Sequence, residues 1–186
     1  GSKEIRADRI DHNPPANSTV KMFPHFQAKG TMEGWRKVAN FYDRPGMEMH
    51  QYIIGLSFGS PLMQLVPQCA SLFHVYSNDP GLGKTTAMMV GASIWGNPEL
   101  ILMREVDTNA TKMNRAEAYK NIFLPLDEMT NVHPKEASDF LYQLTGGMQR
   151  NRLTQSANQE RTRGETWHLN ACSTGNTSLL TRVRMY

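Results

Sequence analysis

A short glycine-bearing segment carries the residues with the clearest chemistry in this chain. Two glycines, a lysine and two threonines occur together in the run Asn78-Asp79-Pro80-Gly81-Leu82-Gly83-Lys84-Thr85-Thr86. Backbone N–H groups that point into a tight loop, together with the N-terminus of a following helix, form a site for anions. A lysine at this place can reach the β- and γ-phosphates of a nucleotide, and the Thr85 hydroxyl can ligate Mg²⁺. The segment therefore predicts a loop that binds the phosphates of a nucleoside triphosphate.

The first position of this loop departs from the usual pattern, because Asn78 stands where a glycine is most common. Asparagine tolerates a left-handed backbone better than other non-glycine residues, so the loop can still form. Gly81 and Gly83 are expected to provide positive φ angles and close approach of the backbone to phosphate. The alternative interpretation is an ordinary glycine-rich turn before a helix.

Two adjacent carboxylates form the second chemical landmark. Asp127 and Glu128 follow an apolar run at 122–126, which is typical of a buried strand. Such a strand would deliver both side chains to the C-terminal edge of a parallel sheet, beside the loop. There Asp127 is expected to hold Mg²⁺ and Glu128 to polarise an attacking water. Pro125 lacks a ladder donor and predicts a bulge or break in this strand.

More polar residues follow the acidic pair. Asn176 comes after an apolar-leaning segment at 167–174 and could hold a water or contact a γ-phosphate at the same sheet edge. Further upstream, two pairs of arginines flank a polar tip at 155–159, which predicts a β-hairpin or an extended loop. Arginines two apart in a strand project from one face and suit phosphate groups, although a solvated loop is the alternative. The four arginines are Arg150, Arg152, Arg161 and Arg163.

The elements that must position these residues follow an alternating pattern. Strands are expected at 73–77, 100–103, 122–126 and 167–174, and helices at 86–95, 111–119 and 134–144. Strands joined to helices by short connections indicate a parallel sheet with both faces covered.

Upstream of the loop, apolar residues recur at helical spacing. One helix is expected to begin after Thr31, its N-cap, and to end before Arg44. A second helix is expected at 47–58 and a short third one at 62–66. The buried stripe of the second helix is predicted to consist of Met49, Tyr52, Ile53 and Leu56.

Length and composition set the broad class. The chain has 186 residues, a formal net charge of +3 and 39% hydrophobic residues, which is enough for one α/β domain with its own core. No apolar run is long enough to span a bilayer and no signal-peptide pattern is present, so we expect a cytoplasmic protein. Cys69 and Cys172 form neither a disulfide framework nor a zinc site. The opening Gly1-Ser2 is typical of a cloning remnant.

The order of these landmarks resembles the AAA+ branch of the P-loop ATPases, and more specifically the replicative primase-helicases of phages and mobile elements, which are similar to superfamily-three helicases. The likeness covers roughly residues 45–186. Three stretches carry it: the loop and helix from Lys84 to Gly96, the run Leu126-Asp127-Glu128-Met129-Thr130-Asn131, and the strand end Ser173-Thr174-Gly175-Asn176.

The resemblance implies a P-loop three-layer sandwich with a central, mostly parallel sheet, preceded by a small helical region. Composition and apolar spacing predict an irregular arm at 1–30 and a helical cap at 31–70. The resemblance implies an ATPase core at 71–186 that ends before the family's final strand and lid. ATP and Mg²⁺ are the implied cofactors. Lys84, Glu128 and Asn176 would be catalytic, the last as the sensor-one residue, and Thr85 and Asp127 would serve the metal.

The resemblance also implies partners. It predicts a motor domain that couples ATP turnover to movement on single-stranded DNA within a homo-oligomeric ring, usually a hexamer, in the cytoplasm of a bacterial host. The arginine-rich segment would contact DNA, and a neighbouring subunit would contribute an arginine, for which Arg150, Arg152 and Arg182 are candidates. One alternative is a switch or assembly ATPase that acts on protein partners, such as a helicase loader or defence sensor. Another is a fragment that binds nucleotide poorly without its lid and neighbour.

Overall fold

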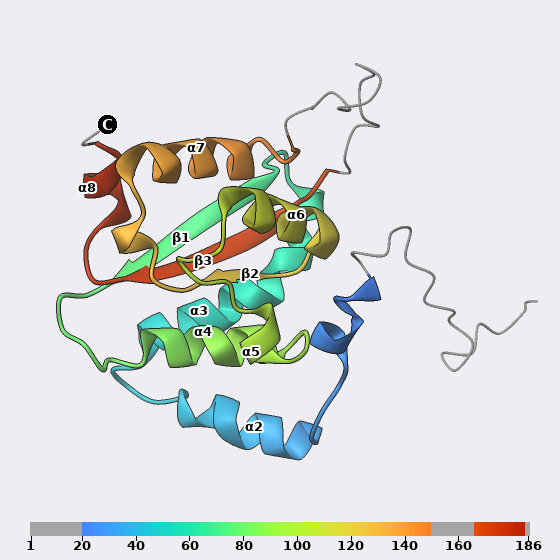
Figure 1. Cartoon of the computed structure of the whole chain (residues 1–186). Coiled ribbons are helices and arrows are strands. Elements are labelled where there is room, and N and C mark those ends of the chain that lie inside the picture. The colour runs from blue at the N-terminus through green and yellow to red at the C-terminus, as the bar shows by residue number, and fades with distance from the viewer. Residues whose placement is uncertain (1–19, 150–165, 185–186) are drawn as a thin grey trace, which may run out of the picture.

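In the part of the chain that the structure describes, a parallel sheet of three strands forms the centre (Figure 1). The computed structural model describes residues 20–149 and 166–184. The strands β1 (Ala70–Tyr76), β2 (Leu124–Leu126) and β3 (Leu169–Gly175) lie in the order β1-β3-β2, with β3 in the middle. Both pairings are parallel. The carboxyl ends of all three strands therefore meet at one edge of the sheet, as the alternating sequence pattern predicted.

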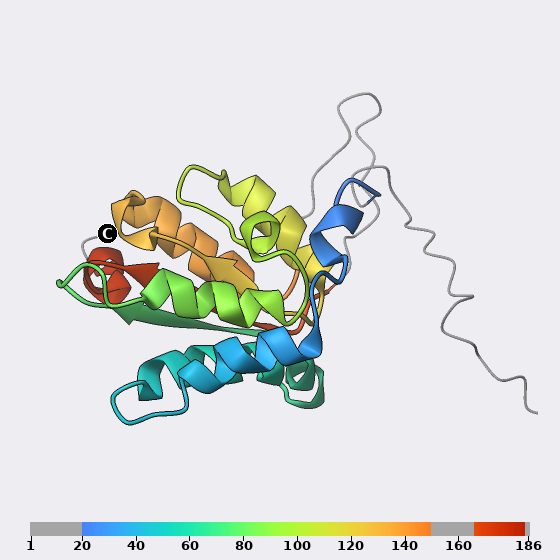
Figure 2. The same cartoon turned by 90° about the horizontal axis from the view of Figure 1, so that it is seen from below.

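Helices pack against both faces of this sheet (Figures 1 and 2). One hydrophobic cluster joins the sheet to α6 (Asn109–Tyr119), α7 (Pro134–Thr145) and α8 (Leu179–Val183). A second cluster joins it to α3 (Glu48–Gly59) and α4 (Lys84–Ser93). Successive residues of β1 divide between them, since Leu72 packs on the first cluster and Phe73 on the second. This division follows from the period of two in a strand.

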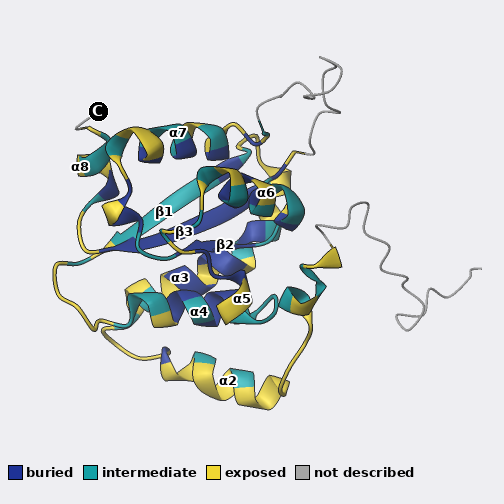
Figure 3. Ribbon diagram, viewed as in Figure 1, coloured by how far each residue is buried: buried dark blue, intermediate teal, exposed yellow. Residues whose placement is uncertain are grey.

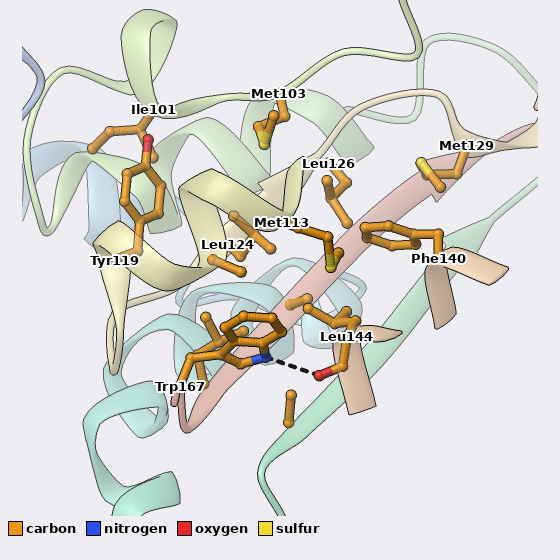
Figure 4. Close-up of a cluster of buried hydrophobic side chains, with 14 of the residues drawn as sticks. Ile101, Met103, Met113, Tyr119, Leu124, Leu126, Met129, Phe140, Leu144 and Trp167 are labelled. Atoms are coloured by element: carbon orange, nitrogen blue, oxygen red, sulfur yellow. Dashed lines mark hydrogen bonds between the residues drawn. The ribbon is translucent and has the colours of Figure 1, made fainter. Parts of the chain in front are cut away.

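Trp167 anchors the chain where it enters β3 (Figure 4). Its side chain is fully buried in the first cluster beside Leu144, and its indole Nε1 donates a hydrogen bond of 2.8 Å to the Leu144 carbonyl. A buried tryptophan contributes a large apolar area, but its N–H requires an acceptor. The last turn of α7 provides that acceptor, so the residue that precedes β3 is tied to the end of α7.

The segment before β1 is helical and packs on the same core; this was expected for 31–70, whereas the 3₁₀ turn at 23–26 lies in the arm that was expected to be irregular. It comprises η2 (Phe23–Phe26), α2 (Met32–Phe41), α3 and η3 (Ser60–Leu65). Thr31 is the N-cap of α2, because its Oγ1 accepts a 3.1 Å hydrogen bond from the Gly34 N–H. Figure 3 shows that α2 is mostly exposed whereas β3 is buried along its length. The Trp35 indole N–H donates to Ser93 Oγ at 2.9 Å and ties α2 to the end of α4.

The buried face of α3 differs from the predicted stripe. Ile53 and Leu56 are buried, but Met49 and Tyr52 are 57% and 48% exposed. The helix is apolar around most of its circumference, so spacing alone could not select the face. Its contact with α4 selects it, where the Ser57 hydroxyl donates a 2.7 Å hydrogen bond to a backbone carbonyl of α4.

The strand predicted at 100–103 is wrong. Residues Pro98–Ile101 form one helical turn, α5, because Asn97 Oδ1 accepts from the Glu99 N–H at 3.1 Å and proline suits the first helical position. Only Met103 retains strand character, as an isolated parallel bridge to Leu126.

The bulge predicted at Pro125 is also wrong, because β2 keeps a regular register in which Pro125 lies opposite Cys172. The Pro125 carbonyl accepts a 3.1 Å hydrogen bond from the Met103 N–H. The nitrogen and carbonyl of a strand residue face the same side, so the missing donor faces this short bridge rather than β3. The proline therefore leaves the β2–β3 ladder intact. Nowhere in 20–149 and 166–184 does a helix combine the length and apolar character needed to cross a membrane.

Candidate nucleotide-binding site

The glycine-bearing loop connects β1 to α4. Gly81 and Gly83 have φ angles of 79° and 76°, in the left-handed region that glycine adopts without penalty. Gly83 is the N-cap of α4, and the first intrahelical bond runs from the Ala87 N–H to the Gly83 carbonyl at 2.9 Å. The amides at 84–86 precede that bond and therefore have no partner within the helix. Asn78 does not adopt the left-handed conformation that its place in the loop suggested, since among described non-glycine residues only Lys120 and Glu128 have positive φ.

A cavity of about 310 Å³ lies beside this loop. It is lined by residues 80–86 of the loop and of α4, and by Glu128, Thr174, Gly175 and Asn176. The parallel sheet explains the meeting, because β2 and β3 both end at the edge from which β1 enters the loop. The fold therefore brings the predicted phosphate loop, Glu128 and Asn176 together around one hollow.

Asp127 is bonded directly to the loop's helix. Its Oδ1 accepts hydrogen bonds from Thr85 Oγ1 at 2.9 Å and from Thr174 Oγ1 at 2.6 Å. Mg²⁺ prefers hard oxygen ligands and commonly keeps several waters while binding one or two protein oxygens and substrate phosphates. Among residues 20–149 and 166–184, no group of three or more His, Cys, Asp or Glu side chains could hold a metal by itself. The pair of Thr85 and Asp127 oxygens beside this hollow fits Mg²⁺ held jointly with a nucleotide.

A left-handed backbone conformation at Glu128 directs its side chain toward the cavity. Adjacent side chains of a plain strand point to opposite faces, so Asp127 and Glu128 could not both serve one site. Glu128, the second residue after β2, has φ 53° and ψ 67°, and this conformation costs a non-glycine residue about 1–2 kcal/mol. Its N–H donates to Thr174 Oγ1 at 3.3 Å, and its carboxylate accepts a hydrogen bond from the Thr130 hydroxyl. These bonds hold Glu128 against the cavity.

Lys84 lies across its own loop. Its Nζ donates to the Ser77 carbonyl at 3.3 Å and to the Asp79 carbonyl at 3.4 Å. Both contacts are long for an ammonium donor, and neither involves a carboxylate. The charge is therefore available to phosphate oxygens placed in the hollow.

Three further residues belong to this region and escaped the sequence reasoning. His50 Nε2 bonds the Leu82 carbonyl at 2.7 Å from α3, and Thr130 contacts Glu128 from η4 (Met129–Asn131). His74 contacts the end of β3 from β1. The sequence held a signal for His74 alone, because a histidine inside an apolar strand is unusual. The roles of His50 and Thr130 depend on tertiary contacts that the sequence does not show.

The predicted arginines fall into two groups. Arg150, Arg152, Arg161 and Arg163 lie outside the described residues, and the hairpin predicted for them lies there as well. Arg182 is described and is partly exposed on α8, which directly follows the Asn176 turn. It stays a candidate for a contact with a neighbouring subunit.

We compared the chain with known protein families, curated proteins and solved structures, and a solved structure of similar fold was found. A family model described as a domain of unknown function, DUF927, matches residues 6–164. A search of curated proteins found no match. Among solved structures, the chain is similar to one described as the active helicase Cch of SCCmec type IV, with a TM-score of 0.60 and 19% sequence identity. The match covers 92% of this chain and 32% of that one, so this chain spans about a third of the helicase's length. The likeness places this chain in a helicase-like α/β fold.

Proposed function

This chain belongs to the DUF927 family of domains of unknown function, and we propose that it is the ATP-hydrolysing motor domain of a replicative DNA helicase of the phage or mobile-element type. ATP binds in the hollow beside the loop, and its turnover drives movement on single-stranded DNA. The helicase-like fold supports the class of protein, and the site supports the chemistry.

One observation carries the proposal: Thr85 Oγ1 lies 2.9 Å from Asp127 Oδ1. These residues are 42 positions apart in sequence and sit on different elements. An ordinary glycine-rich turn before a helix has no reason to face an acidic strand end. A hydroxyl and a carboxylate in contact beside the N-terminus of a helix are what a phosphate site with Mg²⁺ requires.

The residues around the hollow have separate roles. Backbone N–H groups at 84–86 and the Lys84 ammonium bind the β- and γ-phosphates. Glu128 accepts a proton from the attacking water, and Asn176 orients that water. Mg²⁺ held at Thr85 and Asp127 would neutralise charge that develops on the phosphate oxygens.

DNA binding is the part of the proposal that depends on the arginine pairs. Arg150 and Arg152, with their counterparts at 161 and 163, would bind the DNA backbone in a ring of identical subunits, which we expect to be a hexamer. Backbone contacts of this kind weaken steeply as salt rises. Arg182 or one of the hairpin arginines would reach the ATP of the next subunit.

The test is ATP hydrolysis by the full-length parent protein, with Mg²⁺, measured with and without single-stranded DNA. We expect turnover that DNA stimulates, and we expect Lys84→Ala to reduce it at least ~100-fold. Lys37→Ala is the matched control, because Lys37 lies on exposed α2, where it pairs with Glu33 across one helical turn. Absence of turnover in the wild-type protein, or unchanged turnover in Lys84→Ala, would overturn the proposal.

A separate double variant tests the proposed binding of single-stranded DNA. Replacing Arg150 and Arg152 together with alanine should weaken binding of single-stranded DNA while nucleotide binding is preserved, and should flatten the dependence of DNA affinity on salt. DNA binding equal to wild type would refute a role for this segment. Hydrolysis that single-stranded DNA leaves unchanged would favour the switch or assembly ATPase instead.

A further inference from the structure

His74 joins two strands at the edge of the sheet where the candidate site lies. Its ring is partly buried on β1, next to the end of β3. Nδ1 is 2.8 Å from Ser173 Oγ, and Nε2 is 2.9 Å from the Thr177 carbonyl. The ring also stacks on Tyr76, with centroids 5.7 Å apart. Both ring nitrogens therefore contact the segment that carries Asn176.

These partners fix the tautomer. A carbonyl can only accept, so Nε2 carries the proton and donates to Thr177. Nδ1 is then the acceptor for the Ser173 hydroxyl. Burial lowers the pKa of His74 below its ordinary value, and the Thr177 carbonyl and the Glu128 carboxylate act in the opposite direction. The ring is thus a neutral and directional link between β1 and the turn after β3.

The turn is also clamped sterically at Gly175. A Cβ on this glycine would lie 2.5 Å from Thr130 Cγ2 and 2.9 Å from His74 Cε1. The His74 ring and the Thr130 methyl group therefore both pack against the position that a side chain at residue 175 would occupy. Real carbon atoms do not approach so closely, so only glycine fits without movement of a neighbour.

Thr130 connects this clamp to the acidic residue. Its hydroxyl donates to the Glu128 carboxylate and accepts a 3.5 Å bond from the Asn176 N–H. One buried threonine thus touches the predicted base and the predicted sensor residue. His74 contacts the same turn at the Thr177 carbonyl and at Gly175.

We infer that His74 is a positioning residue for the hydrolytic site: it fixes the turn at 175–177 so that Asn176 and Glu128 face the attacking water at a constant separation. The inference rests on the proposed function and adds to it a residue that lies outside the phosphate loop and the acidic pair. His74 itself touches neither phosphate nor water in this scheme.

The test compares His74→Leu with His74→Gln in the full-length parent protein. Leucine removes both hydrogen bonds, whereas the glutamine amide can still donate to the Thr177 carbonyl. Steady-state ATP hydrolysis gives kcat, and binding of a non-hydrolysable ATP analogue gives nucleotide affinity. Hydrogen exchange of peptides covering 173–180 reports the order of the turn without any turnover.

For His74→Leu we expect kcat to fall about 10–100-fold with nucleotide affinity nearly unchanged, since a displacement near 1 Å can cost about 100-fold in rate. The amides of the turn should exchange faster. His74→Gln should recover most of kcat and most of the protection. A purely structural role would lower affinity, kcat and thermal stability together, and glutamine would not rescue them.

The possible results distinguish failure of the inference about His74 from failure of the proposed ATPase function. Wild-type kcat in His74→Leu, an equal loss in His74→Gln, or a parallel loss of nucleotide affinity would overturn the inference while leaving the ATPase proposal in place. If the wild-type protein shows no turnover, the proposed function fails and the inference fails with it.

Discussion

The glycine before Asn176 gives a stringent test of the packing at the site. Gly175→Ala adds one methyl group whose carbon would lie 2.5 Å from Thr130 Cγ2 and 2.9 Å from His74 Cε1. Carbon atoms pack best at about 3.5–4.0 Å, so the first contact is roughly 1 Å too short. Neither neighbour can move freely, because the Thr130 hydroxyl bonds Glu128 and both nitrogens of His74 are hydrogen-bonded.

Overpacking of this kind costs about 1–3 kcal/mol of folding free energy. With a urea m-value of about 2 kcal/mol/M, the unfolding midpoint of Gly175→Ala should fall by roughly 0.5–1.5 M. Urea titration of the 186-residue chain, followed by circular dichroism, measures this shift. Combining the change with Thr130→Ser removes the nearest methyl group and keeps the hydroxyl, so the double variant should recover at least ~0.5 kcal/mol.

Gly55→Ala is the matched control, because the same substitution should have the opposite sign there. Gly55 is exposed inside α3, and a Cβ on it would meet nothing within 4 Å. Alanine favours a helix interior over glycine by up to about 1 kcal/mol, so the midpoint should rise. A Gly175→Ala midpoint equal to wild type, or shifts of the same sign in both variants, would refute the packing described for this turn.

Two further expectations concern titratable groups. Burial raises the pKa of the fully buried Cys172 thiol to about 12, whereas Cys69 is partly exposed. Iodoacetamide should therefore label Cys69 first and Cys172 only after unfolding, which intact-protein mass spectrometry would show. Labelling of Cys172 at the rate of Cys69 would contradict this expectation. Burial also lowers the pKa of His74 below its ordinary 6.5, so this residue contributes stability that is complete above about pH 6.5 and is lost as the pH falls through its folded-state pKa. The urea midpoint should therefore drop between about pH 7.5 and pH 5, and by less in His74→Gln; an equal drop in both would exclude His74 as a source.

The residues of the candidate site were accessible from sequence because they follow local rules. Two glycines, a lysine and a threonine between a strand and a helix predict an anion site with little tertiary information, and the positive φ angles of Gly81 and Gly83 agree with it. The adjacent carboxylates after an apolar run predict their delivery to a sheet edge by the same logic. Asn78 shows the limit of pattern matching, since it occupies a glycine position without needing a left-handed backbone.

Sequence order by itself determined the parallel α/β class and the places of the glycine-bearing loop and of the acidic pair, because these depend on near neighbours and on the period of strands and helices. Only the tertiary structure decided which face α3 buries. That helix is apolar around most of its circumference, and its contact with α4 selects the face that is buried. The same holds for Thr130 and His74, whose hydrogen-bonding partners on other elements no spacing rule connects to them. These side chains meet because the parallel strands bring their carboxyl ends to one edge of the sheet. No local sequence pattern specifies which residues then come into contact.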